Sequence, residues 1–129
     1  MPPVRTILVV DNEEIVRDVA RAILRSRGYD VLLAESGDAA IALIRENADE
    51  ICLILLDAGL TGWSARNAAA ALLAINPHLA VVVSSGSLPE EALQHFDPYR
   101  VSGFVQKPYT ASRLSDAVSL ALQTRRMAA

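Results

Sequence analysis

The chain has 129 residues, of which 52% are hydrophobic, and carries 12 basic and 15 acidic side chains for a formal charge of −3. This length fits one domain with a substantial buried core. We therefore expect a single domain over residues 1–129, with its core at about residues 6–123 and short tails at both ends. The single cysteine excludes a disulfide scaffold, and with only two histidines beside it a zinc cluster is excluded as well.

The charge and the apolar runs exclude further classes of protein. A mildly acidic chain lacks the clustered positive surface that nucleic-acid binding needs. No apolar run reaches the roughly 20 residues of a membrane span, and the N-terminus lacks the layout of a signal peptide. We expect a cytoplasmic domain that neither binds nucleic acid directly nor inserts into a membrane.

Five short apolar runs predict strands. They cover residues 6–10, 30–34, 51–56, 79–83 and, more weakly, 101–105. Three of them (ILVV, ICLILL and LAVVV) are apolar without alternation, which is typical of strands buried on both faces of a parallel sheet.

Segments with helical spacing separate these runs. In residues 13–27, Ile15, Val19 and Ile23 recur every four residues and predict the apolar face of a helix that ends at Gly28. The fifth helix is expected to begin at Thr110 and to end before a frayed tail at residues 123–129. Its predicted inward-facing residues are Leu114, Val118, Ala121 and Leu122.

The helices between them are predicted from their caps. Ser36 is expected to cap the second helix, and Ser64 the third, which ends before Pro77. Ser87 and Glu90 predict a capping box for a short fourth helix. Strands and helices thus alternate, which predicts an α/β fold: a doubly wound parallel sheet with helices on both faces.

In such folds ligands bind beyond the carboxyl ends of the strands. The polar residues expected there are Asp11, Asn12, Glu13, Asp57, Ser84, Ser85 and Lys107. Asp57 ends the most apolar strand and is a candidate carboxylate nucleophile that forms an acyl phosphate. Asp11 is expected beside it, and two carboxylates ~4 Å apart repel by about 4 kcal/mol unless a cation such as Mg²⁺ bridges them.

Two further residues complete the predicted site. Lys107, the only lysine in the chain, can pair with Asp57 and then with a phosphoryl oxygen, to which Ser85 can also donate. Taken alone, each residue has a structural interpretation: a helix cap for the aspartates, a turn for the serines and a solvated surface amine for the lysine. Their joint occurrence at four strand ends favours one functional site.

In order along the chain, the segments ILVVDNEEIVR, GYDVLLAESGDAAIALI, LILLDAGLTGWS, VVVSSGS and GFVQKPYT resemble the receiver domain of two-component response regulators. The resemblance implies a five-stranded (βα)5, flavodoxin-like fold with strand order 2-1-3-4-5. It also implies a signalling phosphoacceptor rather than an enzyme, with self-phosphotransfer and slow autodephosphorylation as its only chemistry.

The resemblance also implies roles for single residues. Asp57 would accept a phosphoryl group from a histidine kinase or a histidine phosphotransfer protein. The Mg²⁺ ligands would be Asp11, Asn12, Asp57 and the backbone carbonyl of Gly59. Ser85 and Phe104 would be the switch residues, and Lys107, joined to Pro108 by a cis peptide bond, would bind the phosphate.

The output surface implied by the family spans the fourth helix, fifth strand and fifth helix, at about residues 89–126. It would bind a downstream effector or a dimer partner. The sequences of these motifs are most similar to those of receivers of hybrid histidine kinases. The chain is therefore interpreted either as an isolated regulator or as the C-terminal receiver of a hybrid sensor kinase, whose kinase activity would lie outside this chain.

The chain departs from the family at Asn12, where a second acid is usual, and at Thr61, where proline is frequent. Asn12 predicts weaker Mg²⁺ binding and slower or more conditional phosphorylation. Glu13, which follows it, either compensates for the missing acid through another geometry or caps the first helix, and the cap is the expected role. The alternative function is therefore a degenerate receiver that binds proteins without phosphorylation. A haloacid dehalogenase-type enzyme would need an aspartate at Gly59, and dinucleotide or flavin binding would need a glycine-rich loop after the first strand.

Overall fold

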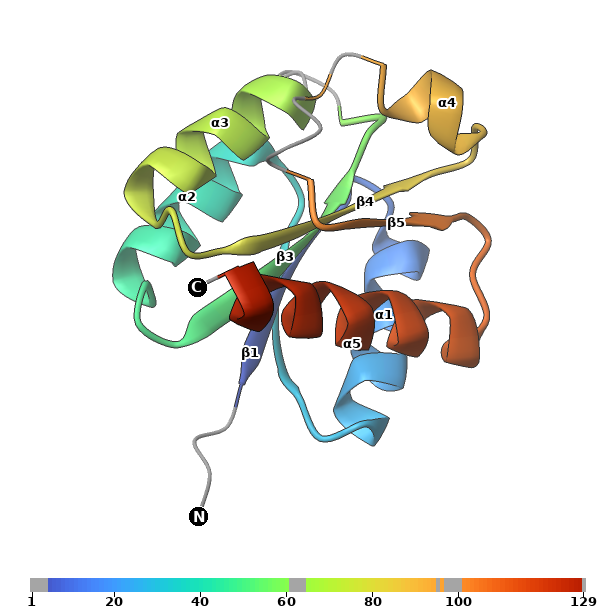
Figure 1. The fold of residues 1–129 in the computed structure, drawn as a ribbon, viewed down its shortest axis with the longest axis horizontal. Helices are drawn as coiled ribbons and strands as arrows, with labels where there is room; N and C mark the ends of the chain where they lie inside the picture. The colour runs from blue at the N-terminus through green and yellow to red at the C-terminus, as the bar shows by residue number, and fades with distance from the viewer. Residues whose placement is uncertain (1–4, 61–64, 95, 97–100, 129) are drawn as a thin grey trace.

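The computed structural model describes residues 5–60, 65–94, 96 and 101–128, so the predictions at Thr61 and Ser64 lie outside the described residues. Strands and helices alternate along the chain (Figure 1). They are β1 (Thr6–Val10), α1 (Glu14–Ser26), β2 (Asp30–Ala34), α2 (Gly37–Glu46), β3 (Ile51–Asp57), α3 (Ala65–Ile75), β4 (Ala80–Ser85), α4 (Pro89–Ala92), β5 (Gly103–Gln106) and α5 (Ala111–Ala128). None of the described helices is long and apolar enough to span a membrane.

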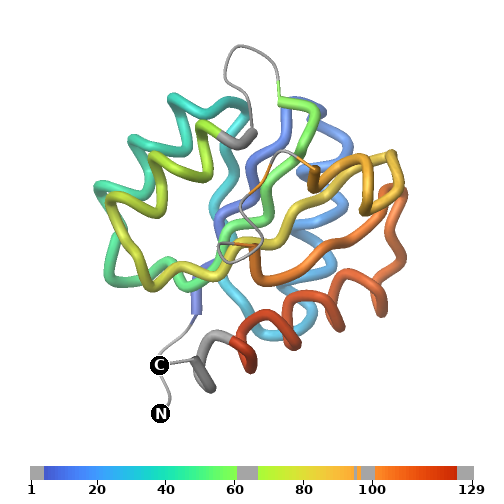
Figure 2. The backbone as a smooth tube through the Cα atoms, turned by 45° about the horizontal axis from the view of Figure 1, so that its top comes forward, coloured from blue at the N-terminus to red at the C-terminus, as the bar shows by residue number. Residues whose placement is uncertain are grey.

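The strands form one parallel sheet in the order β2-β1-β3-β4-β5, which confirms the predicted fold. Helices α2 and α3 cover one face, and α1 and α5 cover the other (Figures 1 and 2). Since all strands run in the same direction, their carboxyl ends meet at one edge of the sheet.

Alternate residues of each central strand enter the two halves of the core. On β1, Leu8 and Val10 pack toward α2 and α3, whereas Ile7 and Val9 pack toward α1 and α5. Strands β3 and β4 alternate in the same way. Burial on both faces explains why these strands are apolar throughout.

Several helix ends agree with the ends predicted from the sequence. Ser36 Oγ accepts a hydrogen bond from Ala39 N (3.1 Å), and Thr110 Oγ1 accepts one from Arg113 N (3.2 Å). Gly28 follows α1 with φ of +92°, a conformation that glycine adopts without strain.

The predictions for two other helix ends were wrong. Helix α4 has Leu88 at its N-cap and no side-chain cap, because the Ser87 N–H turns back to Ser85 Oγ (3.0 Å) and the expected capping box does not form. Helix α5 continues to Ala128, so most of the expected tail is helical.

The predicted apolar face of α1 was also wrong at its first two positions. Ile15 is 79% exposed and Val19 is 44% exposed, whereas Ala20 and Leu24 are buried. Residues four apart advance by about 40° around a helix, so the stripe rotates from solvent at Ile15 toward the core at Ile23. The exposed end of this stripe lies beside the site described next.

Candidate functional site

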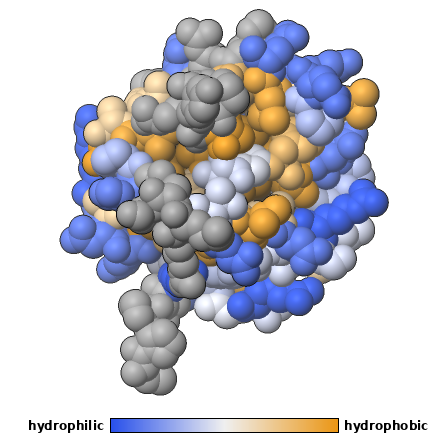
Figure 3. All heavy atoms as spheres, viewed as in Figure 1, coloured by the Kyte–Doolittle hydropathy of each residue, from blue (hydrophilic) through white to orange (hydrophobic). Residues whose placement is uncertain are grey.

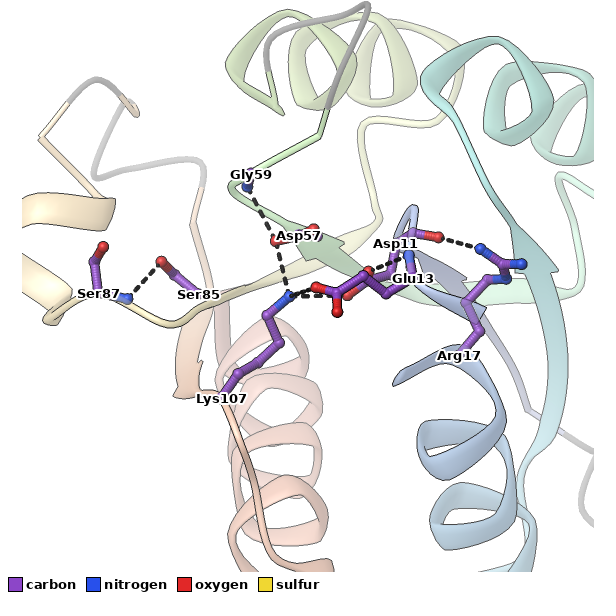
Figure 4. A network of polar contacts seen from close by, with 8 residues as sticks. All are labelled: Asp11, Glu13, Arg17, Asp57, Gly59, Ser85, Ser87 and Lys107. Carbon is purple, nitrogen blue, oxygen red and sulfur yellow. Dashed lines mark hydrogen bonds and ion pairs between the residues drawn. The ribbon is translucent and has the colours of Figure 1, made fainter. Parts of the chain in front are cut away.

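The candidate site forms where the carboxyl ends of β1, β3 and β5 meet (Figure 4). Asp57 is the last residue of β3, Asp11 directly follows β1, and Lys107 directly follows β5. Lys107 Nζ lies 3.2 Å from Asp57 Oδ1 and 3.2 Å from Asp11 Oδ2. Three residues that are far apart in the sequence are thus brought to one point.

The two carboxylates are buried and both contact the Lys107 ammonium. Asp11 is 2% exposed and Asp57 is 4% exposed. Burial is the main reason why the pKa of Asp11 is raised, and the nearby charge of Asp57 acts in the same direction. Burial alone would lower the pKa of the Lys107 ammonium, but the carboxylates of Asp57 and Asp11 outweigh it and raise that pKa.

Backbone hydrogen bonds hold both carboxylates in place. Gly59 N donates to Asp57 Oδ1 (3.0 Å), and Glu13 N donates to Asp11 Oδ1 (2.9 Å). The guanidinium of Arg17 donates to the backbone carbonyl of Asp11 (2.7 Å) and so ties the end of β1 to α1. The carboxylates are therefore oriented before any ligand binds.

Ser84 and Ser85 end β4 beside this cluster, and both are buried. Ser84 pairs with Asp57 across the sheet, and the carbonyl of Ser85 accepts a hydrogen bond from Lys107 N (2.8 Å). The peptide bond between Lys107 and Pro108 is cis. Backbone contacts thus fix the position of Ser85 relative to Lys107.

An open cavity of about 810 Å³ lies over the cluster. Its lining combines the predicted site residues with an apolar rim from α1 and from the segment after β5. The lining residues are Asn12, Glu13, Ile15, Val16, Val19, Asp57, Gly59, Ser85, Gly86, Ser87, Lys107, Pro108 and Tyr109. The cavity is large enough for a phosphoryl group together with a side chain that delivers it.

Phe104 lies outside this cavity. It lines a separate hollow of about 270 Å³ between the segment that follows α4 and the start of β5, together with Leu93, Phe96 and Val101. In Figure 3, apolar atoms are exposed on this face of the molecule, close to α4. The structure therefore separates one expected switch residue, Ser85 in the site, from the other, Phe104 on the adjacent surface.

The donor set fits a hard divalent cation. Two carboxylates and the side-chain oxygen of Asn12 are oxygen ligands of the kind that Mg²⁺ prefers, and Mg²⁺ usually retains several waters. In the described part of the chain, no three His, Cys, Asp or Glu side chains group closely enough to form a metal site by themselves. A cation here would therefore need water and a backbone oxygen, for which the carbonyl of Gly59 remains the predicted donor.

Some residues of this site were not predicted from the sequence. Tyr109 and Val16 line the cavity, and Arg17 anchors Asp11, without having been singled out. The position of Arg17 could have indicated this contact, since Arg17 follows Asp11 by only six residues and lies in the first turns of α1, next to the end of β1. Glu13 was expected to cap the helix, but its Oε1 lies 3.7 Å from Lys107 Nζ.

Tyr109 gives a prediction for the pH dependence of stability. Burial, with the negative charges of Asp11 and Asp57, raises the pKa of its phenol above 10.0. The unfolded chain therefore loses this proton first, and the free energy of unfolding should fall by about 1 kcal/mol as the pH rises from about 10 to about 11. Urea unfolding should show a smaller fall for Tyr109→Phe, and an equal fall would contradict this assignment.

Fold and site together define a flavodoxin-like α/β domain with an acidic pocket and one lysine at its strand ends. The sequence profile of the response regulator receiver domain matches residues 7–119. The chain belongs to the response regulator receiver domain family of two-component signalling.

Individual relatives agree with this family. The chain is 28% identical to a cyclic di-GMP phosphodiesterase of Thermotoga maritima and 25% identical to the sensor kinase CckA of Brucella abortus. These matches cover 93% and 92% of this chain but only 32% and 12% of the relatives, so the chain spans a third or less of their length. The solved receiver domain of NtrX from Brucella abortus is 32% identical with a TM-score of 0.82, and the match covers 92% of this chain and 98% of that one.

Proposed function

We propose that this chain is a single receiver domain whose Asp57 accepts a phosphoryl group from a phosphohistidine. The donor is a histidine kinase or a histidine phosphotransfer protein, and Mg²⁺ is the cofactor. The observation that carries the proposal is the Lys107 ammonium, which lies 3.2 Å from each of two buried carboxylates. A lysine in a purely structural ion pair needs only one carboxylate as its partner. In a phosphoacceptor site, the lysine also has to balance the negative charge of the arriving phosphoryl group.

In the proposed reaction, Asp57 Oδ2 attacks the phosphorus atom. A phosphorus–oxygen bond forms, the phosphorus–nitrogen bond breaks, and the donor histidine leaves with the electron pair. Oδ1 is held by Gly59 N and by Lys107, which leaves Oδ2 as the oxygen assigned to the attack. Mg²⁺, held by Asp11, Asp57, Asn12 and the carbonyl of Gly59, would offset the negative charge of the transferring group.

Two side chains would then hold the product. Lys107 provides a positive charge for one phosphoryl oxygen. Ser85 Oγ accepts the Ser87 N–H, so its hydroxyl proton remains available for another phosphoryl oxygen. Movement of Ser85 would reach the output face through β5, because Ser85 pairs with Gln106 and Val83 pairs with Phe104.

The proposed output is a change in the surface formed by α4, β5 and α5. Phe104 and the apolar hollow of about 270 Å³ beside it lie on this surface. We propose that phosphorylation changes the packing of Phe104 and with it the affinity for an effector or for a second copy. Both a stand-alone regulator and a receiver of a hybrid sensor kinase fit this proposal.

The proposal is tested by incubating the chain with acetyl phosphate and Mg²⁺ and measuring its intact mass. We expect the addition of one phosphoryl group, with no addition when Mg²⁺ is removed by a chelator. An unchanged mass, also with a phosphorylated histidine phosphotransfer domain as donor, would favour the degenerate receiver that binds proteins without phosphorylation.

Asn12 is the observation that favours this second candidate, and Asn12→Asp tests whether this residue limits the site. The variant adds a carboxylate to the cavity wall, so we expect about tenfold tighter Mg²⁺ binding and faster labelling by acetyl phosphate. Calorimetric titration with Mg²⁺ measures the first effect. Unchanged affinity would show that position 12 does not limit metal binding in this chain.

The exposed apolar rim of the cavity predicts a protein as the phosphoryl donor. Ile15 and Val19 are exposed, yet they line the cavity that contains Asp57. We expect Ile15→Ser to slow transfer from a phosphorylated histidine phosphotransfer domain about tenfold and to leave labelling by acetyl phosphate unchanged. Leu120→Ser, at an exposed position of α5, is the matched control. Equal rates for both variants would exclude this rim from donor binding.

A further inference from the structure

We propose that Glu13 replaces the electrostatic contribution of the acid that is missing at position 12, an inference that rests on the proposed function. In this assignment its carboxylate attracts the divalent cation from outside the first coordination shell. It acts as a positioning residue for Lys107 and the metal rather than as a direct ligand.

The first observation is that Glu13 does not perform the role expected from its place in the sequence. It occupies the N-cap position of α1 with extended backbone, but its side chain makes no cap hydrogen bond. Asp11 Oδ1 instead accepts the N–H of Glu13 itself (2.9 Å), so the Glu13 backbone is held without use of its own side chain. The carboxylate of Glu13 is therefore available for another partner.

The second observation is where this carboxylate lies. The Glu13 side chain is 64% exposed, yet Oε1 lies 3.7 Å from the Lys107 ammonium. Figure 4 shows it extending toward the point where Lys107 meets Asp11 and Asp57. Glu13 also lines the cavity beside Asn12. A third carboxylate thus faces the same ammonium from the solvent side.

The charges explain why this position matters in this chain. Asp11, Asp57 and Glu13 carry three negative charges against one positive charge on Lys107, whereas Asn12 is neutral. Without Glu13, an arriving dication would meet a cluster with a net charge of −1 instead of −2. Since no third acidic side chain groups closely enough for direct coordination in the described residues, Glu13 is expected to act through the water shell that Mg²⁺ keeps.

Calorimetric titration with Mg²⁺ tests this role in the wild type and in three variants: Glu13→Gln, Glu14→Gln and the double variant Asn12→Asp with Glu13→Gln. We expect Glu13→Gln to weaken Mg²⁺ binding about fivefold, because one charge is removed near the site. Glu14→Gln removes the same charge one residue away, outside the cavity lining, and is expected to change the affinity less than about twofold. In the double variant the new acid at position 12 should restore wild-type affinity or exceed it.

Equal affinities of Glu13→Gln and Glu14→Gln would overturn the role of Glu13 and leave the proposed function intact. Weak binding that persists in the double variant would also overturn it, because the two positions would then not compensate for each other. Absence of Mg²⁺ binding in the wild type would instead contradict the proposed metal site itself, and the role of Glu13 would fall with it. Urea unfolding of each variant verifies that the fold is retained.

Discussion

Asp57→Asn is expected to abolish phosphorylation by acetyl phosphate while the fold is retained. The amide has almost the same shape as the carboxylate but is a poor nucleophile toward phosphorus. The substitution also removes one of two buried charges that share Lys107, so the folded state is expected to tolerate it. Intact mass spectrometry after incubation with acetyl phosphate and Mg²⁺ measures the loss.

Asp116→Asn is the matched control for this substitution. Asp116 lies on the exposed surface of α5, so the same change of charge there should leave phosphorylation at the wild-type level. A wild-type mass increase in Asp57→Asn would show that another residue accepts the phosphoryl group.

Lys107→Met is expected to slow phosphorylation roughly 100-fold, because a fixed positive charge beside the transferring group is lost. It should also lower the free energy of unfolding at pH 7 by about 2 kcal/mol, since two buried carboxylates lose their common partner. This is less than for a fully buried pair, because the Lys107 side chain is 14% exposed. Labelling rates and urea unfolding measure the two effects.

The pH dependence of this loss has a definite sign. The pKa of Asp11 is already raised in the folded wild type, so the folded state binds the proton of this carboxyl more tightly than the unfolded state does. Protonation of Asp11 therefore stabilises the fold at low pH, and this stabilisation is lost as the pH rises. Removing Lys107 removes an influence that lowers this pKa. The stability deficit of Lys107→Met should therefore shrink as the pH falls toward about 4. A deficit independent of pH would mean that packing rather than charge is lost, and Arg113→Met on the exposed side of α5 is the control.

The fold could be predicted from the sequence because its strands are buried on both faces. Such strands appear as continuous apolar runs, and the β3 run ends at Asp57, which directly precedes the loop at the sheet edge. The rule that ligands bind at carboxyl strand ends then predicted a common position for Asp11, Asp57 and Lys107, and the structure brings these side chains together.

Side-chain directions at the start of α1 could not be predicted in the same way. Spacing alone placed Ile15 and Val19 on the apolar face, because periodicity does not say where along a helix its contact with the sheet begins. The direction of the Glu13 side chain depends on Lys107, which lies far away in the sequence, and on Asp11, whose Oδ1 accepts the Glu13 N–H. Such competition between local and distant partners is visible only in three dimensions.

The most direct test of the central claim is to locate the phosphoryl group on the chain. After incubation with acetyl phosphate and Mg²⁺, borohydride reduces an aspartyl phosphate to homoserine, which peptide mass spectrometry assigns to one residue. The proposed function predicts homoserine at position 57 and at no other aspartate. An unmodified Asp57, or homoserine at another position, would contradict it.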